Sequence, residues 1–365
     1  MTITIATFLS SVARAFPVPL LPFFESEFSI SHSVAVWIIA ASSLSLLASI
    51  PMGYISDRYG RKWLIVCGMF LISTATFLSG SSQTAGQLIA FQFLLGLGSA
   101  AFIPSSSAII GDIFPAAPRA RAVSITLTGV FSGIVTGFLM AGMLVGTIGW
   151  RASFYLVAVL ILAAALVVGK LIEEPVKEHI AGASPVFKLN STIYICTFIQ
   201  GIVGEGIRTM SPLYMAKYQI GNESIGMSLA AMTAASLVIL PLAGRLADRV
   251  GRKKPIIAGF LFSVPVIFSF PMVTTPDQFT VVLALLGAGA GISLPATSAY
   301  AQDASQRIRG TVLGINHTSW VAGATVSPVL GGILADSIGI GATFKLYALA
   351  ALVGAGITVA LLKEK

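Results

Sequence analysis

The ten residues GYISDRYGRK, at positions 53–62, separate two long apolar segments. They bring one carboxylate, Asp57, together with the cations Arg58, Arg61 and Lys62. The residues GRLADRVGRK, at positions 244–253, repeat this stretch at an offset of 191 residues. The paired residues are Gly53 and Gly244, Asp57 and Asp248, Arg58 and Arg249, Gly60 and Gly251, and Arg61 and Arg252.

The same offset recurs further along the chain. It pairs Gly96 with Gly287, Gly98 with Gly289, Pro104 with Pro295 and Asp112 with Asp303. Self-similarity at one fixed offset, over about sixty residues, is the sequence signature of a repeated structural unit. The chain is therefore expected to consist of two duplicated halves.

The composition indicates a membrane protein. Of its 365 residues, 56% are hydrophobic and only 10% are charged, and the mean hydropathy is +0.91. A soluble domain has about 25% charged residues. The net charge of +8 is gathered into short clusters between apolar runs, so it does not indicate a nucleic-acid partner.

The apolar runs are each long enough to cross a bilayer, at a rise of about 1.5 Å per residue. Twelve spans are expected, at 2–22, 33–55, 63–80, 86–110, 121–145, 152–170, 191–213, 223–244, 255–274, 278–299, 310–334 and 342–362. We expect a six-helix bundle over residues 1–170, a cytoplasmic linker over 171–190 and a second six-helix bundle over 191–365.

The distribution of Lys and Arg sets the orientation. The segments after even-numbered spans and at the C-terminus hold 17 of the 22 basic residues. Because cytoplasmic loops are enriched in Lys and Arg, both termini are expected in the cytoplasm, in the cell membrane. Six spans per half then insert both halves in the same direction, as parallel repeats.

The pattern G-x-L-A-D-R-x-G-R-K between the second and third spans of a half resembles the signature loop of the major facilitator superfamily of transporters. Residues 244–253 fit it fully, and residues 53–62 carry Ile55 and Ser56 where Leu and Ala are usual. The resemblance covers essentially the whole chain. It implies an all-α membrane protein of twelve helices in two pseudo-symmetric bundles, with spans 1, 4, 7 and 10 lining a central cavity.

In the proteins that this chain resembles, the signature loop is a conformational latch. A carboxylate at the end of one helix can accept hydrogen bonds from the N-terminus of a neighbouring helix. The alternative is that these basic loops only bind anionic headgroups. The expected latch residues are Gly53, Asp57, Arg58, Gly60, Arg61, Asp112, Arg119, Arg121, Gly244, Asp248, Arg249, Gly251, Arg252, Asp303, Arg307 and Arg309.

Three charged residues are clear cases of a charge inside a predicted span: Arg14, Glu205 and Arg208. Inserting each costs about 2.5–3.5 kcal/mol, so each needs a partner or a watery cavity. Two arginines facing one cavity would form a bidentate anion clamp. The alternative is that Glu205 neutralises one of the arginines in a purely structural pair.

Further candidates come from spans 4 and 11. Gln92 stands where many relatives carry an Arg that is associated with proton coupling. In span 11, Trp320 follows His317 on the same helix face. A lone His is often a structural hydrogen-bonding group, and Trp320 is either a cavity wall or core packing. The expected substrate-binding residues are Arg14, Gln92, Arg208, Asn316, His317 and Trp320, and the expected proton carriers are Glu205 and His317.

The sequence contains no enzymatic or nucleotide-binding motif. Cys67 and Cys196 lie inside apolar runs, so neither a disulfide framework nor a metal site is expected, and no cofactor is implied. The expected partners are a small-molecule substrate, protons and the lipid bilayer, and the expected state is a monomer.

These features predict a secondary transporter that works by alternating access and is driven by a gradient, by default of protons. The two arginines favour an organic anion as substrate. The alternative is a proton-driven exporter of amphipathic or cationic drugs, with Glu205 as the recognition charge. A non-transporting sensor is a minor alternative, because such proteins add a long soluble tail and this chain ends three residues after its last predicted span.

Overall fold

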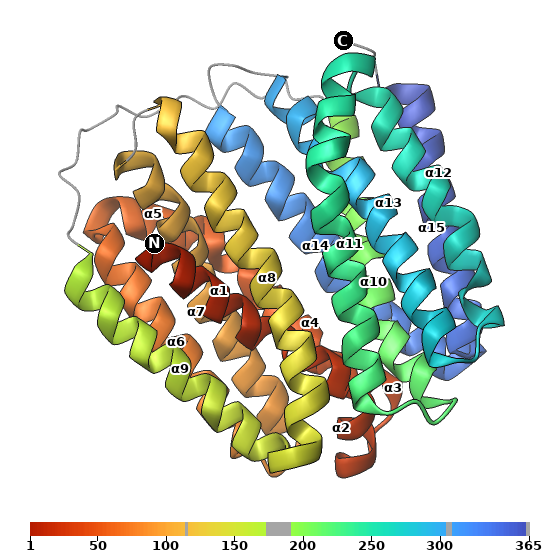
Figure 1. Cartoon of the computed structure of the whole chain (residues 1–365), viewed down its shortest axis with the longest axis horizontal. Helices are drawn as coiled ribbons and strands as arrows, with labels where there is room; N and C mark the ends of the chain where they lie inside the picture. The colour runs from red at the N-terminus through yellow and green to blue at the C-terminus, as the bar shows by residue number, and fades with distance from the viewer. Residues whose placement is uncertain (114–115, 173–190, 304–308, 363–365) are drawn as a thin grey trace. The chain divides into compact units, whose positions relative to one another are not determined.

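A computed structural model describes residues 1–113, 116–172, 191–303 and 309–362. The described residues are almost entirely helical and contain no strand (Figure 1). The helices of the first expected bundle are α1 (Thr2–Ala15), η1 (Val18–Leu20), α2 (Leu21–Phe28), α3 (His32–Ala35), α4 (Trp37–Ser45), η2 (Leu46–Ala48), α5 (Ser49–Tyr59), α6 (Arg61–Gly80), α7 (Ala85–Ile113), α8 (Ala116–Ile148) and α9 (Trp150–Leu171). Those of the second are α10 (Ser191–Ala216), α11 (Asn222–Val250), α12 (Lys253–Ser269), η3 (Phe270–Met272), α13 (Pro276–Asp303), α14 (Arg309–Ile338) and α15 (Ile340–Leu361).

Internal contacts divide the chain into two compact units. Unit 1 comprises Met1–Lys177 and Gly221–Ala230, and unit 2 comprises Glu178–Ile220 and Ala231–Lys365. The start of α11 therefore belongs to unit 1, where a side chain at Gly226 would meet the Phe138 carbonyl oxygen of α8. Most of the predicted linker, residues 173–190, lies outside the described residues, so the predicted bundle boundaries remain a prediction.

Eleven segments of the described chain are long and apolar enough to cross a membrane. They begin and end within a few residues of eleven predicted spans, except that span 1 extends to Phe28, span 8 to Val250 and span 11 to Ile338. The segment outside this set is α10, which contains Glu205 and Arg208. The least apolar of the expected spans is thus the one that carries two charges.

Turns between helices show the duplication in the backbone. Glycines with positive φ separate helix pairs at Gly60 (φ 116°) and Gly251 (φ 88°), and at Gly149 (φ 80°) and Gly339 (φ 89°). Only glycine reaches these conformations without steric cost. The two described non-glycine residues with positive φ, Ser29 and Gln219, are also 190 residues apart. Every described residue with positive φ therefore has an equivalent with positive φ in the other half.

Helix packing follows the same equivalence. In unit 1, α6 packs on α7 and α9, and α1 packs on α8; in unit 2, α12 packs on α13 and α15, and α10 on α14. Small residues permit these contacts. A Cβ at Gly133 would lie 2.3 Å from the Phe8 carbonyl oxygen, and a Cβ at Gly323 would lie 2.1 Å from the Phe198 carbonyl oxygen.

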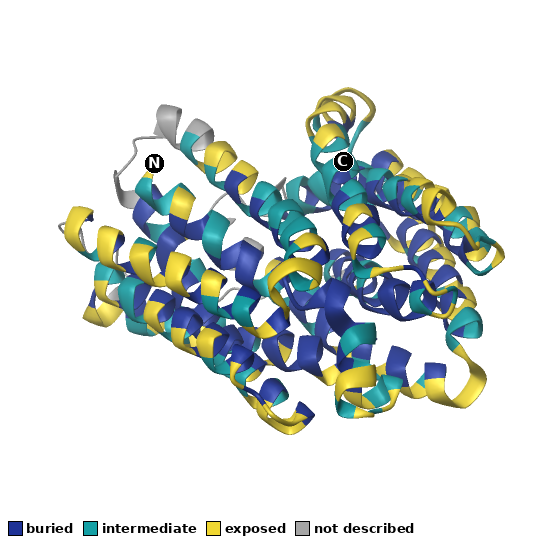
Figure 2. Cartoon of the chain, turned by 60° about the horizontal axis from the view of Figure 1, so that its bottom comes forward, coloured by how far each residue is buried: buried dark blue, intermediate teal, exposed yellow. Residues whose placement is uncertain are grey.

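The helix α9 shows how burial is distributed. Its buried positions, including Phe154, Val157, Ala158 and Ile161, recur at helical spacing, yet its exposed side is also apolar. The exposed residues between its charged ends, Arg151 and Lys170, are Leu156, Val159, Leu160, Leu162, Ala163, Leu166 and Val167. Figure 2 shows buried and exposed residues alternating around the helices in this way. A helix that is apolar all round, with one side uncovered, is a membrane span.

Candidate functional site

The charged centre of unit 2 is an ion pair within α10. Arg208 Nη2 donates to Glu205 Oε1 at 2.5 Å, across one helical turn. The Glu205 side chain is 3% exposed and that of Arg208 is 20% exposed. Arg208 Nε is buried and has no hydrogen-bond partner among the described residues. Of the two alternatives raised by the sequence, the pairing of Glu205 with Arg208 is therefore present, and it leaves one guanidinium donor unused.

Neighbouring helices fix the backbone around this pair. Ser327 Oγ of α14 donates to the Ile202 carbonyl oxygen at 2.6 Å, and the Tyr347 hydroxyl of α15 donates to the Ser327 carbonyl oxygen at 3.1 Å. A Cβ at Gly206 would lie 2.4 Å from both Ser327 Oγ and the Tyr347 ring. The turn that carries Glu205 is thus closely packed against α14 and α15, so the backbone that bears the carboxylate is held in place.

A second polar group lies nearer the start of α10. Thr197 Oγ1 donates to Asn316 Oδ1 of α14 at 2.7 Å, and Gln200 Nε2 donates to Thr297 Oγ1 of α13 at 2.9 Å. Asn316 was an expected site residue, whereas Thr197, Gln200 and Thr297 were not. The signal was available, because a glutamine within an apolar span is as unusual as the nearby Glu205.

Arg14 occupies the last turn of α1, where the first span is broken. Prolines at 17, 19 and 22 interrupt the helix because proline lacks an N–H, and a short η1 follows. The unpaired carbonyls at a helix C-terminus favour a positive charge. The end of α1 therefore contributes to stabilising the charge of Arg14.

The structural register shows that Arg14 and Arg208 are not equivalent positions. The contacts Gly133 with Phe8 and Gly323 with Phe198 align α1 with α10 at an offset of 190 residues. At that offset the equivalent of Arg14 is Gly204, one turn before Arg208. The two halves therefore carry their arginines at different depths along their first helices.

The remaining expected binding residues lie in different surroundings. Gln92 is buried, and its Nε2 donates to Ser79 Oγ at 3.1 Å, which joins α7 to α6. His317 is exposed and Trp320 half-buried on α14. The Trp320 carbonyl oxygen lies 2.3 Å from where a Cβ at Gly201 would be, at the crossing of α14 and α10. The assignment of these residues to substrate binding or proton transfer remains a prediction.

The signature loops make contacts within each half. Arg61 Nη1 donates to the Ala108 carbonyl oxygen of α7 at 2.8 Å, and its equivalent Arg252 pairs with Asp248. Arg58 lies over the Tyr59 ring, with its guanidinium 5.6 Å from the ring centroid. Arg249 is exposed, and a Cβ at Gly53 or Gly244 would meet no atom within 4 Å. These contacts are internal to each half, so the latch between halves remains a prediction.

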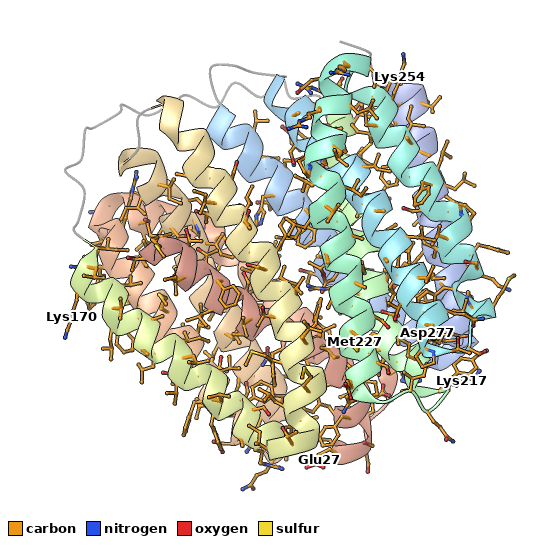
Figure 3. The ribbon with its side chains drawn as sticks, in the orientation of Figure 1. Glu27, Lys170, Lys217, Met227, Lys254 and Asp277 are labelled. Carbon is orange, nitrogen blue, oxygen red and sulfur yellow. The ribbon has the colours of Figure 1, made fainter. Side chains whose placement is uncertain are left out.

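Several expected latch side chains fall outside the described residues. They are the side chains of Asp57, Asp112, Arg119, Arg121, Asp303, Arg307 and Arg309. Figure 3 shows charged residues at opposite ends of unit 2, with Lys254 at one end and Lys217 and Asp277 at the other. Among the described residues, no three His, Cys, Asp or Glu side chains are grouped as a metal site would require.

The repeated helices, the signature loops and the long apolar spans are the features of a polytopic helical membrane protein. The sequence profile of the Major Facilitator Superfamily matches residues 3–188 and 193–365. The chain belongs to this superfamily and is a multi-pass membrane protein that transports small molecules, not an enzyme.

Individual relatives share 28% of their aligned residues with this chain. The multidrug resistance protein MdtG of Escherichia fergusonii is 28% identical over 362 residues, which span 93% of this chain and 88% of that protein. The protein of the same name from Klebsiella pneumoniae (strain 342) is 28% identical over 371 residues, or 95% of this chain and 90% of that protein.

Solved structures share the fold. A bacterial homolog of the human lysosomal transporter Spinster, in its inward-facing and unoccupied conformation, has a TM-score of 0.85 at 16% identity and covers 98% of this chain and 95% of its own. A variant of the nucleoside transporter NupG has a TM-score of 0.82 at 12% identity, with 99% of both chains covered.

Proposed function

We propose that this protein exports amphipathic cationic compounds in exchange for protons, across the cell membrane and with both termini in the cytoplasm. This is the exporter alternative that the sequence left open, and the names of the MdtG relatives favour it over the organic anion. The observation that carries the proposal is the buried Glu205–Arg208 pair.

The pair explains how cation and proton can share one site. Glu205 is a carboxylate inside a span, so its charge must be neutralised, and Arg208 now does this. A proton or a cationic compound can take the place of Arg208 at the carboxylate, but both cannot do so together. Mutually exclusive occupancy of one carboxylate is the thermodynamic basis of exchange.

The pair also leaves an organic anion open as substrate. Glu205 and Arg208 together have no net charge, so the pair by itself favours neither sign of substrate charge, and the choice of a cation rests on the names of the relatives. The observation that favours an anion is the buried Arg208 Nε, which has no hydrogen-bond partner among the described residues. The organic anion is therefore retained as the second candidate substrate.

The test is cation-driven proton movement in proteoliposomes that contain the purified protein. Wild type should release protons from the lumen when ethidium is added outside, and Glu205→Gln should abolish this exchange. Glu223→Gln is the matched control, because Glu223 is an exposed carboxylate in the first turn of α11. Undiminished exchange in Glu205→Gln would reject Glu205 as the coupling residue.

A further inference from the structure

The Gln200 amide has a fixed orientation that leaves its oxygen without a donor. Thr297 Oγ1 donates its single proton to the Ser293 carbonyl oxygen at 2.8 Å. Thr297 can therefore only accept from Gln200, which assigns Nε2 to that contact at 2.9 Å. Gln200 Oε1 is then a buried acceptor with no hydrogen-bond partner among the described residues.

The surroundings of Gln200 suggest where a donor can enter. Gln200 is only 8% exposed. On one side along α10, Thr197 is already bonded to Asn316. On the other side, about 6 Å along the helix axis, Gly204 lies on the same helix face. A Cβ at Gly204 would meet no atom within 4 Å, so this face is open one turn from Gln200.

Other glycine positions on α10 offer no such space. A Cβ at Gly201 would lie 2.3 Å from the Trp320 carbonyl oxygen, and one at Gly206 would strike Ser327 and Tyr347. The open face at Gly204 leads in the other direction along the helix to Arg208, and hence to its pair with Glu205. An amphipathic cation bound at Glu205 would therefore extend along this face toward Gln200.

We propose that Gln200 Oε1 is a specificity-determining acceptor, which selects among cationic compounds those that also carry an N–H or O–H donor. The proposal rests on the export of cations proposed above. A buried acceptor without a donor costs free energy, and a ligand donor that satisfies it gains that energy back. A site built around such an acceptor discriminates against analogues that lack the donor.

Two permanent cations provide the probes. Ethidium carries two aromatic amino groups, whereas tetraphenylphosphonium has no N–H or O–H group. Transport of each would be measured in proteoliposomes at low substrate concentration, for wild type and Gln200→Leu. Because one hydrogen bond contributes a factor of about five, Gln200→Leu should lower ethidium transport about fivefold and leave tetraphenylphosphonium within about twofold.

The matched control is Thr209→Val. Thr209 Oγ1 is also buried without a hydrogen-bond partner among the described residues, but it lies on the opposite side of α10. Thr209→Val should leave the ratio of the two transport rates unchanged. Gln200→Met, which keeps the length of the side chain, replaces Gln200→Leu if the latter lowers the melting temperature.

The outcomes separate the two proposals. Selective loss of ethidium transport supports Gln200 as the acceptor. Equal loss or no loss for both cations overturns it while leaving cation export standing, and indicates that a bound water satisfies Oε1. If wild type transports neither cation, the proposed function fails and the role of Gln200 fails with it.

Discussion

Glu205 and Arg208 form a pair in which each charge makes the other tolerable inside the membrane. Because Glu205 is almost fully buried, the loss of Arg208 leaves a carboxylate with no compensating cation. A double substitution removes both charges and avoids this penalty. The two single substitutions should therefore not be additive with each other.

Arg208→Met should lower the free energy of unfolding by about 3 kcal/mol, because it leaves a buried carboxylate without its cation. The double variant Glu205→Gln with Arg208→Met should recover most of this loss. Thermal unfolding in detergent would measure both. A double variant less stable than Arg208→Met would show that Glu205 is stabilised by groups other than Arg208.

The sequence identified the residues of this charge pair but not their arrangement. Arg14 and Arg208 lie in the first predicted span of their respective halves. The helix contacts align Arg14 with Gly204, at an offset of 190 residues, whereas Arg14 and Arg208 are 194 residues apart. Arg208 therefore lies about one turn further along α10 than the equivalent of Arg14.

At the scale of helices, the turns between spans depend on backbone freedom. Gly149 precedes α9 with φ 80° and ψ 158°, a conformation that essentially only glycine adopts. A Cβ at this position would meet no atom within 4 Å, so any cost of substitution comes from the backbone alone. The same holds for Gly339, its equivalent before α15.

Gly149→Ala should destabilise the protein by about 1–3 kcal/mol. The matched control is Gly146→Ala on α8, where φ is not positive and the Cβ also meets open space. This control should be neutral or slightly stabilising, because alanine favours helices over glycine. Equal melting temperatures for the two variants would show that the turn does not require glycine.

Helix crossings depend on glycine for a different reason. Gly323→Ala would place a methyl group 2.1 Å from the Phe198 carbonyl oxygen, which is backbone and cannot rotate away. We expect a loss of about 1–3 kcal/mol. Gly314→Ala on the same helix meets no atom within 4 Å and serves as control. A fully stable Gly323→Ala protein would indicate that α10 and α14 can separate without cost.

The span boundaries were largely predictable, because apolar length and basic loops are strong signals in a membrane protein. The breaks within spans were harder to predict. Span 1 is divided at Ala15 and extends to Phe28, beyond the predicted end at residue 22. Span 2 is divided by η2 at Leu46–Ala48, and Pro51 follows this break and cannot donate a hydrogen bond to the Leu47 carbonyl oxygen. Both breaks lie beside prolines that the sequence shows, but a proline alone does not determine whether a span ends there or continues as a further helix.

At the scale of the whole molecule, the sequence predicts that the signature loop couples the two halves during transport. We expect Asp57→Asn to lower the transport rate about tenfold while leaving membrane insertion unchanged. Asp277→Asn is a suitable control, because Asp277 lies in the first turn of α13 and belongs to no signature loop. Full transport by Asp57→Asn would reject the latch hypothesis, and these loops would then have a role in topology alone.

The most direct test of a cation-exporting site is ligand-dependent thermal unfolding of the purified protein. A ligand that binds the native state raises the melting temperature by mass action. Ethidium and tetraphenylphosphonium would be compared with a dicarboxylate and a phosphate ester, for wild type and Arg14→Gln. We predict stabilisation by the cations in both proteins. Stabilisation only by an anion, lost in Arg14→Gln, would contradict cation export and establish the arginine clamp instead.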